Sequence, residues 1–186
     1  WGTNYKVGKS KYYICEADEY NDNFLSYSPN IAIVLNIAWD HPDFFPDKES
    51  IIHSYLNFIN NLEDEGTLII KSQVFEQFKN KIRKDIKIRL IKDFSNVNLS
   101  LIGDFRAENA NAALTLAQEL KINTNKAINT LETFKGLGRR LEYKGEVQGV
   151  KFYDDYAVQP YTILKTTNAL CDEFTKSKIT LVLEPH

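Results

Sequence analysis

The sequence predicts an α/β protein with a largely parallel sheet flanked by helices, on three observations. Several apolar runs are short, rich in β-branched residues and nearly continuous, which is typical of strands covered on both faces. These runs are residues 12–15, 31–37, 67–70 and 179–183. Stretches with helical spacing of apolar residues lie between them. The order strand, strand, helix, strand, helix favours parallel pairing.

Three helices are predicted in the first two thirds of the chain. Residues 47–62 repeat apolar side chains at helical spacing, and Asp47 follows a proline where an N-cap is expected. Residues 107–120 form an alanine-rich helix, and 125–134 a weaker one. Small side chains in the alanine-rich helix permit close packing against a sheet. They are Ala110, Ala113 and Ala117.

Two shorter, partly alternating runs, 86–91 and 99–102, are expected to form a small antiparallel edge. Residues 134–140 contain two glycines and are predicted to be a linker. A domain boundary near Gly138 divides the chain into domains 1–138 and 139–186.

The second domain is predicted to begin at residues 145–153, either with a hairpin-like pair of strands or with one strand and a turn. A helix over 161–174 and the strand at 179–183 follow. We expect this to be the start of a second, Rossmann-like α/β domain.

Composition excludes several classes of function. The formal net charge of −2 gives no basic surface for nucleic acid and no polybasic membrane patch. No apolar run is long enough to cross a bilayer. The two cysteines lie far apart in sequence, which favours free thiols and a reducing, cytoplasmic compartment. Because the chain contains no methionine and stops just after an apolar run, we expect it to be a piece of a longer protein.

Two polar clusters follow predicted strands, where ligands gather in open α/β sheets. Residues 15–22 include Glu16, which could hold Mg²⁺; the alternative is a solvated acidic turn. In the second cluster, His41 lies between Asp40 and Asp43. Carboxylates fix the tautomer of a histidine and raise its basicity, which suits a metal ligand, although a structural loop histidine is the commoner case.

Three further positions suit nucleotide binding. The amide of Asn109, in the first turns of the alanine-rich helix, could pair with a purine edge. Arg140 in the linker could bind a phosphate when two domains close, and Asp154 at a strand end could accept ribose hydroxyls. Each also fits a plain surface helix, a solvated basic pair or a turn.

The order and spacing of these motifs are more specific than any one of them. The motifs are Glu-Ala-Asp-Glu, Asn-Ile-x-x-Asp-His-x-Asp, Asn-Ala-x-Ala-Ala, Arg-Arg-x-Glu and Tyr-Asp-Asp-Tyr-Ala. Together they resemble the middle of a member of the Mur ligase family. The first and last motifs look most like the branch that joins L-alanine to UDP-N-acetylmuramate. Residues 43–47 would suit the branch that attaches a recycled murein tripeptide, and a folate polyglutamate ligase is a distant third.

The resemblance implies an ATP- and Mg²⁺-dependent, ADP-forming ligase that activates a UDP-muramyl carboxylate as an acyl phosphate and transfers it to an amino acid. It implies a truncated central ATPase domain whose phosphate loop lies before Trp1. By the same resemblance, Glu16 would ligate the Mg²⁺ that bridges the nucleotide phosphates, and His41 would ligate a second Mg²⁺ near the transferring phosphoryl group. Asn109 would contact adenine, Arg140 would reach the γ-phosphate, and Asp154 would hold the ribose.

Two departures from the family pattern are visible. Phe105 and Arg106 stand where the family commonly has His-Asn, and Val158, Gln159 and Pro160 stand where it tends to have two histidines. They motivate an alternative of another class, a non-catalytic nucleotide-binding remnant.

Overall fold

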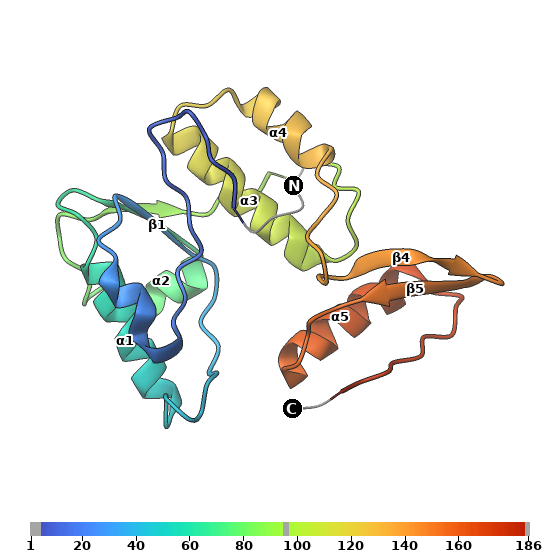
Figure 1. The fold of residues 1–186 in the computed structure, drawn as a ribbon. Helices are drawn as coiled ribbons and strands as arrows, with labels where there is room; N and C mark the ends of the chain where they lie inside the picture. Colours follow the sequence, from blue (N-terminus) through green and yellow to red (C-terminus); the bar gives the residue numbers. More distant parts are fainter. Residues whose placement is uncertain (1–4, 95–96, 185–186) are drawn as a thin grey trace.

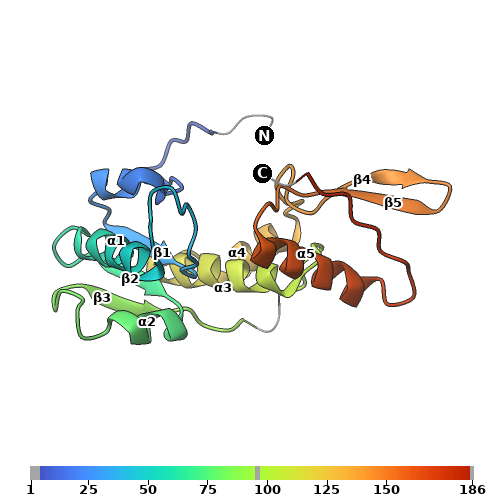
Figure 2. The same ribbon diagram turned by 90° about the horizontal axis from the view of Figure 1, so that it is seen from below.

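A parallel sheet of three strands organises the first half of the chain in the computed structural model, which describes residues 5–94 and 97–184. Strands β1 (Ile31–Val34), β2 (Thr67–Ile70) and β3 (Lys87–Leu90) lie in the order β1-β2-β3 (Figures 1 and 2). Both pairs are parallel, with Ile31 opposite Thr67 and Thr67 opposite Lys87. The predicted parallel sheet is therefore confirmed. The predicted antiparallel edge is wrong, because β3 pairs parallel to β2 and residues 99–102 form no strand.

Helix α1 (Lys48–Asn60) connects β1 to β2 and begins where the sequence predicts. The Asp47 side chain accepts a hydrogen bond from the Ser50 backbone N–H (2.8 Å). The Ser50 hydroxyl lies within hydrogen-bonding distance of the Asp47 backbone N–H (3.4 Å), which completes a capping box. This cap fixes the point at which the loop after β1 turns into the helix.

The hydrophobic core lies between α1, the sheet and helix α2 (Ser72–Phe78), which the sequence did not predict. Phe24 stacks on Phe58 with ring centroids 4.7 Å apart. Phe24 belongs to η1 (Tyr20–Ser26), an irregular 3-10 segment. Burial of Phe24 therefore anchors η1 against α1.

Helices α3 (Asp104–Glu119) and α4 (Thr124–Glu132) pack against each other, and α3 also contacts β2. The predicted alanine face is partly wrong: Ala110 and Ala117 are buried, but Ala113 is exposed. The buried set of α3 overlaps the predicted one at two positions. It consists of Ala110, Ala112, Leu114, Thr115 and Ala117.

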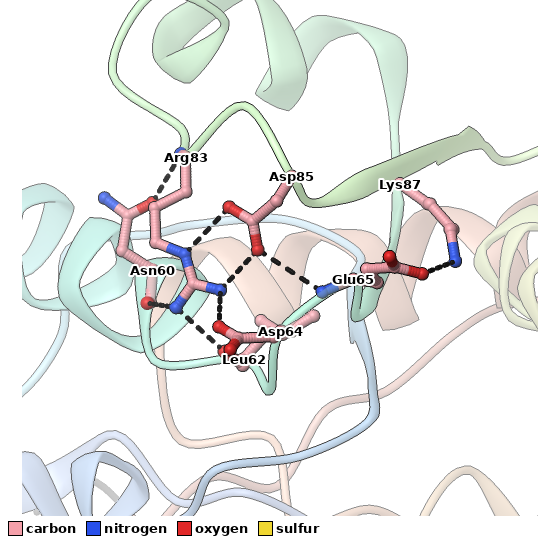
Figure 3. Close-up of polar contacts among 7 residues, drawn as sticks. All are labelled: Asn60, Leu62, Asp64, Glu65, Arg83, Asp85 and Lys87. Carbon is pink, nitrogen blue, oxygen red and sulfur yellow. Dashed lines mark hydrogen bonds and ion pairs between the residues drawn. The ribbon is translucent and has the colours of Figure 1, made fainter.

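A polar network ties together the turns at the amino ends of β2 and β3 (Figure 3). The Arg83 guanidinium donates to the carbonyl oxygens of Asn60 (3.0 Å) and Leu62 (3.1 Å), which lie at the end of α1. It also donates to Asp64 (3.2 Å) and to both carboxylate oxygens of Asp85 (3.1 and 2.6 Å). One planar cation therefore neutralises two acidic turns and occupies carbonyls that the helix leaves free.

The last part of the described chain forms a hairpin and a helix. Strands β4 (Glu142–Val147) and β5 (Val150–Asp154) pair antiparallel, and helix α5 (Pro160–Glu173) follows. In both views the hairpin and α5 lie on one side of the molecule and the three-stranded sheet on the other, with α3 between them (Figures 1 and 2). The hairpin and the helix were predicted; the boundary near Gly138 stays a prediction.

Two predicted strands do not form. Residues 12–15 and 179–183 pair with no other segment among the described residues. Ile14 is 79% exposed and Val182 is 95% exposed. A strand needs a neighbouring edge for its backbone N–H and C=O groups, and apolar composition alone does not provide one.

In the described residues, no helix is both long and apolar enough to cross a bilayer.

Candidate functional site

The candidate site lies beyond the carboxyl end of β1, where the loop leading to α1 meets the segment before η1. Hydrogen bonds hold η1 against α1 at two places. The Ser54 hydroxyl donates to the Asp22 carboxylate, and the Asn61 amide donates to the carbonyl oxygens of Leu25 (3.1 Å) and Tyr27 (2.6 Å). The segment that carries Glu19 is therefore fixed beside the loop that carries His41.

Glu19, Asp40 and His41 form a compact group of ligand atoms, all within 4.8 Å of one another. His41 Nε2 lies 3.6 Å from a Glu19 carboxylate oxygen and 3.8 Å from Asp40 Oδ2. All three side chains are half-buried, so solvent reaches the group from one side. Two carboxylates and an imidazole at this spacing could bind a divalent cation. Alternatively, the two carboxylates could form ion pairs with a protonated His41.

The backbone of His41 lies in the left-handed region, with φ +54°. Its carbonyl oxygen accepts hydrogen bonds from the N–H groups of Phe44 (2.9 Å) and Phe45 (2.8 Å), so the chain turns tightly after it. The Trp39 indole closes this loop by donating to the Phe45 carbonyl (2.9 Å). A non-glycine residue in this region carries strain, which the surrounding hydrogen bonds offset.

Tyr20 supports the imidazole from the η1 side. Its ring lies 4.8 Å from the His41 ring, and its hydroxyl donates to Asp43 Oδ2 (2.9 Å). The hydrogen bond and the nearby charge of Asp43 raise the pKa of Tyr20 above its ordinary value. Of the two acids that flank His41 in sequence, Asp40 therefore faces the imidazole and Asp43 holds its aromatic neighbour.

Negative charge acts on Tyr55, a residue of α1. Burial raises the pKa of Tyr55 most, and the charges of Glu19, Asp18 and Asp40 raise it further. The phenol consequently stays protonated. The three carboxylates near Tyr55 make a region that attracts cations.

Four of the five predicted site residues lie outside this group, and two of these, Glu16 and Asn109, belong to neither cluster described in this structure. Glu16 is exposed, and the carboxylate near His41 belongs to Glu19, three positions later in the same acidic run. Asn109 is exposed on α3. Its neighbours Glu108 and Asn111 line a shallow hollow of about 140 Å³ at the ends of β2 and β3, but Asn109 does not. The roles predicted for Glu16 and Asn109 stay predictions.

The other two, Arg140 and Asp154, fall in one cluster at the predicted linker. Asp154 Oδ2 lies 3.9 Å from Arg139 Nε. The guanidinium groups of Arg139 and Arg140 lie over the Tyr156 ring, 4.8 and 5.8 Å from its centroid. Two guanidinium groups and an acceptor are thus close together on the surface, an arrangement suited to a phosphorylated ligand.

The positions that depart from the family pattern make contacts of their own. Arg106 donates to the carbonyl oxygens of Ile102 (3.2 Å) and Arg140, and burial lowers its pKa from the ordinary value. Gln159 donates from its amide to Asp40 Oδ1 across 119 positions of sequence. No local sequence pattern predicts either contact, whereas Glu19 is part of the acidic run at residues 15–22.

Comparison with known proteins identifies the fold. A sequence profile described as the Mur ligase middle domain matches residues 3–95, which is half of the chain. The chain belongs to the Mur ligase family. The predicted resemblance is therefore confirmed.

Individual Mur ligases align with nearly the whole chain. A UDP-N-acetylmuramate–L-alanine ligase of Caldicellulosiruptor saccharolyticus is 32% identical, over 100% of this chain and 47% of that protein. The chain thus spans about half the length of the curated relatives it matches. The crystal structure of a UDP-N-acetylmuramate-alanine ligase from Thermotoga maritima superposes with a TM-score of 0.65 at 16% identity, covering 83% of this chain and 41% of that one. A MurF ligase from the same organism, solved in complex with ADP, gives 0.63 at 18% identity, covering 80% and 41%. At these identities the structural likeness concerns the Mur ligase fold alone.

Proposed function

We propose that the chain is the central part of an ATP- and Mg²⁺-dependent ligase that joins L-alanine to the carboxylate of UDP-N-acetylmuramate, by way of an acyl phosphate, in peptidoglycan synthesis. The observation that carries the proposal is the group of Glu19, Asp40 and His41 at the carboxyl end of a parallel strand. The relatives that align with the whole chain carry the corresponding name. A cytoplasmic location is part of the proposal, since the nucleotide substrates are made there.

Glu19, Asp40 and His41 would hold one Mg²⁺. On the ground of the family resemblance, Glu16 would ligate a separate Mg²⁺ at the nucleotide phosphates. The bound cations would offset charge between the nucleotide phosphates and the substrate carboxylate. Two half-buried carboxylates supply the negative charge for this, and the Tyr20 ring keeps the imidazole beside them. The two carboxylates of the donor set supply the oxygen ligands that a hard cation such as Mg²⁺ prefers.

The linker cluster would bind the nucleotide. Arg140 is exposed and free to turn toward a phosphate, while Asp154, at the end of β5, would accept ribose hydroxyls. Asn109 would contact the adenine. Gln159 already joins α5 to the His41 loop. Movement of residues 139–186 would therefore bring the linker cluster closer to the group of Glu19, Asp40 and His41.

The test is ATP turnover by the protein at its full natural length. ADP and phosphate should form only when both UDP-N-acetylmuramate and L-alanine are present, because the acyl phosphate is made on one substrate and consumed by the other. Formation of AMP would disprove the proposed chemistry. A panel containing L-alanine and the murein tripeptide separates the two branches, for which residues 43–47 leave a choice.

Substitution tests the site directly. His41→Ala should lower turnover by at least about 100-fold, because one of three clustered ligand groups is lost. The matched control is His53→Ala, which removes an exposed imidazole from α1 and should leave turnover unchanged. Equal activity in both variants would remove the role assigned to His41.

A further inference from the structure

Gln159 stands where a histidine is usual in the family, and its amide contacts the candidate cation site. Asp40 Oδ1 accepts two hydrogen bonds, one from the His41 backbone N–H (2.6 Å) and one from the Gln159 amide. Its second oxygen, Oδ2, faces His41 Nε2 at 3.8 Å. The two donors therefore fix the direction in which Asp40 presents its remaining oxygen.

The backbone of Gln159 is held in place before the side chain reaches Asp40. Gln159 is the N-cap residue of α5, followed by a proline in the first turn. Its carbonyl oxygen accepts hydrogen bonds from the Thr162 hydroxyl and the Ile163 N–H, both at 2.9 Å. Its side chain makes no capping hydrogen bond to its own helix. The amide is thus available to a partner outside α5.

The loop before Gln159 is also fixed, by a carboxylate that neither cluster uses. Asp155 accepts from the Ala157 N–H (2.8 Å) and from the Thr166 hydroxyl on α5 (3.2 Å). These contacts join the end of β5 to the second turn of α5. A change in the position of Asp40 is consequently transmitted to α5 and the hairpin rather than absorbed by a loose loop.

An amide also suits this place electrostatically. It stabilises the Asp40 carboxylate by donating a hydrogen bond but adds no positive charge. A lysine or arginine there would compete with a divalent cation for the same carboxylate. The negative charge of Glu19 and Asp40 stays available to a cation while the geometry is kept.

We infer that Gln159 is a positioning residue: it orients Asp40 within the Glu19–Asp40–His41 group and couples docking of α5 to cation binding there. The coupling to cation binding rests on the proposed function. The tether, which is the hydrogen bond from the Gln159 amide to Asp40, does not rest on it. Because coupling between two equilibria is reciprocal, loss of the tether weakens cation binding by the factor by which cation binding strengthens the tether.

The tether is tested without metal, by a reciprocal exchange in the 186-residue chain with a chelator present. Gln159→Glu places two carboxylates together and should raise the unfolding equilibrium constant about 5-fold. In an Asp40→Asn background the same Gln159→Glu substitution should be much less harmful, because the new side-chain amide at position 40 can donate to the introduced carboxylate. If Gln159→Glu is equally harmful in both backgrounds, the tether does not exist.

The coupling is tested by calorimetric titration with Mn²⁺. Gln159→Ala should weaken binding by roughly 10-fold, as loss of an outer-shell partner of a metal ligand does. The control Val158→Ala, which trims an exposed neighbour, should bind as wild type does. Unchanged affinity in Gln159→Ala overturns the coupling. Absence of Mn²⁺ binding by wild type overturns the cation role in the proposed function, and the exchange experiment still decides on the tether.

Discussion

Asp85 is held by Arg83 through both of its carboxylate oxygens (3.1 and 2.6 Å), in the network that joins the turns before β2 and β3. The pKa of Asp85 is lowered from 3.8 to about 2, chiefly because Arg83 donates hydrogen bonds to its carboxylate. The folded protein therefore binds the Asp85 proton less readily than the unfolded chain does. The resulting stabilisation is complete above the unfolded pKa of about 4 and disappears as the pH falls through about 2.

Asp85→Asn should remove this part of the pH dependence. Between pH 5 and pH 2, the urea midpoint of the wild-type chain should fall more steeply than that of the variant, with the two curves converging at the acid end. Asp64→Asn is the matched control, because Asp64 contacts the same guanidinium but is fully exposed (100%) and screened by water. Parallel curves for wild type and Asp85→Asn would contradict the assignment.

At the scale of single elements, the start of α1 is the feature whose stability is easiest to alter. Asp47→Ala removes the side-chain acceptor for the Ser50 N–H and with it the capping box. We expect a loss of about 1 kcal/mol in the free energy of unfolding, measured by urea denaturation. Asn57→Ala, on the exposed face of the same helix, should cost nothing or stabilise slightly. A loss as large in Asn57→Ala as in Asp47→Ala would show that the cap is not the cause.

Because the cap sits directly after the His41 loop, Asp47→Ala should also loosen the backbone of that loop. The effect on turnover should be far smaller than that of His41→Ala, since Asp47 touches none of the three clustered ligand groups. The two substitutions thus separate positioning of the loop from the chemistry of its side chains.

At the scale of the whole molecule, the core cluster joins η1, the sheet, α1 and α2, while the hairpin and α5 bury few side chains of their own. Lys135, Arg139 and Arg140 are exposed in the segment between α4 and β4. Limited trypsin digestion should therefore cut first there, apart from trimming at the exposed lysines near the two ends, which are those up to Lys11 and Lys176 and Lys178. A stable product ending near residues 135–140, identified by mass spectrometry, would support the boundary near Gly138. Earlier cleavage inside α3 or α5 would argue against it.

The features that the sequence predicted correctly are those set by neighbouring residues. The buried run at 67–70, the cap at Asp47 and the hairpin each depend on a few adjacent side chains. The runs at 12–15 and 179–183 have the same composition as buried strands, yet strand formation also depends on a free neighbouring edge. Composition carries no information about that edge.

The same distinction applies to the candidate site. Asp40 and His41 are adjacent in sequence, and their proximity was predictable. The approach of Glu19 depends on the turn in η1, where Asn21 and Asp22 both adopt positive φ. The Gln159 contact depends on how α5 docks against a loop 119 positions away. Neither is encoded in a local pattern.

The Arg83 network and the His41 loop lie at opposite rims of one parallel sheet, because the network precedes β2 and β3 and the loop follows β1. Inactivating substitutions near His41 should accordingly yield protein that still accumulates and purifies well. During evolution, substitutions at the end of the sheet that carries His41 could therefore change ligand specificity, while the Arg83 network at the other end kept the fold intact.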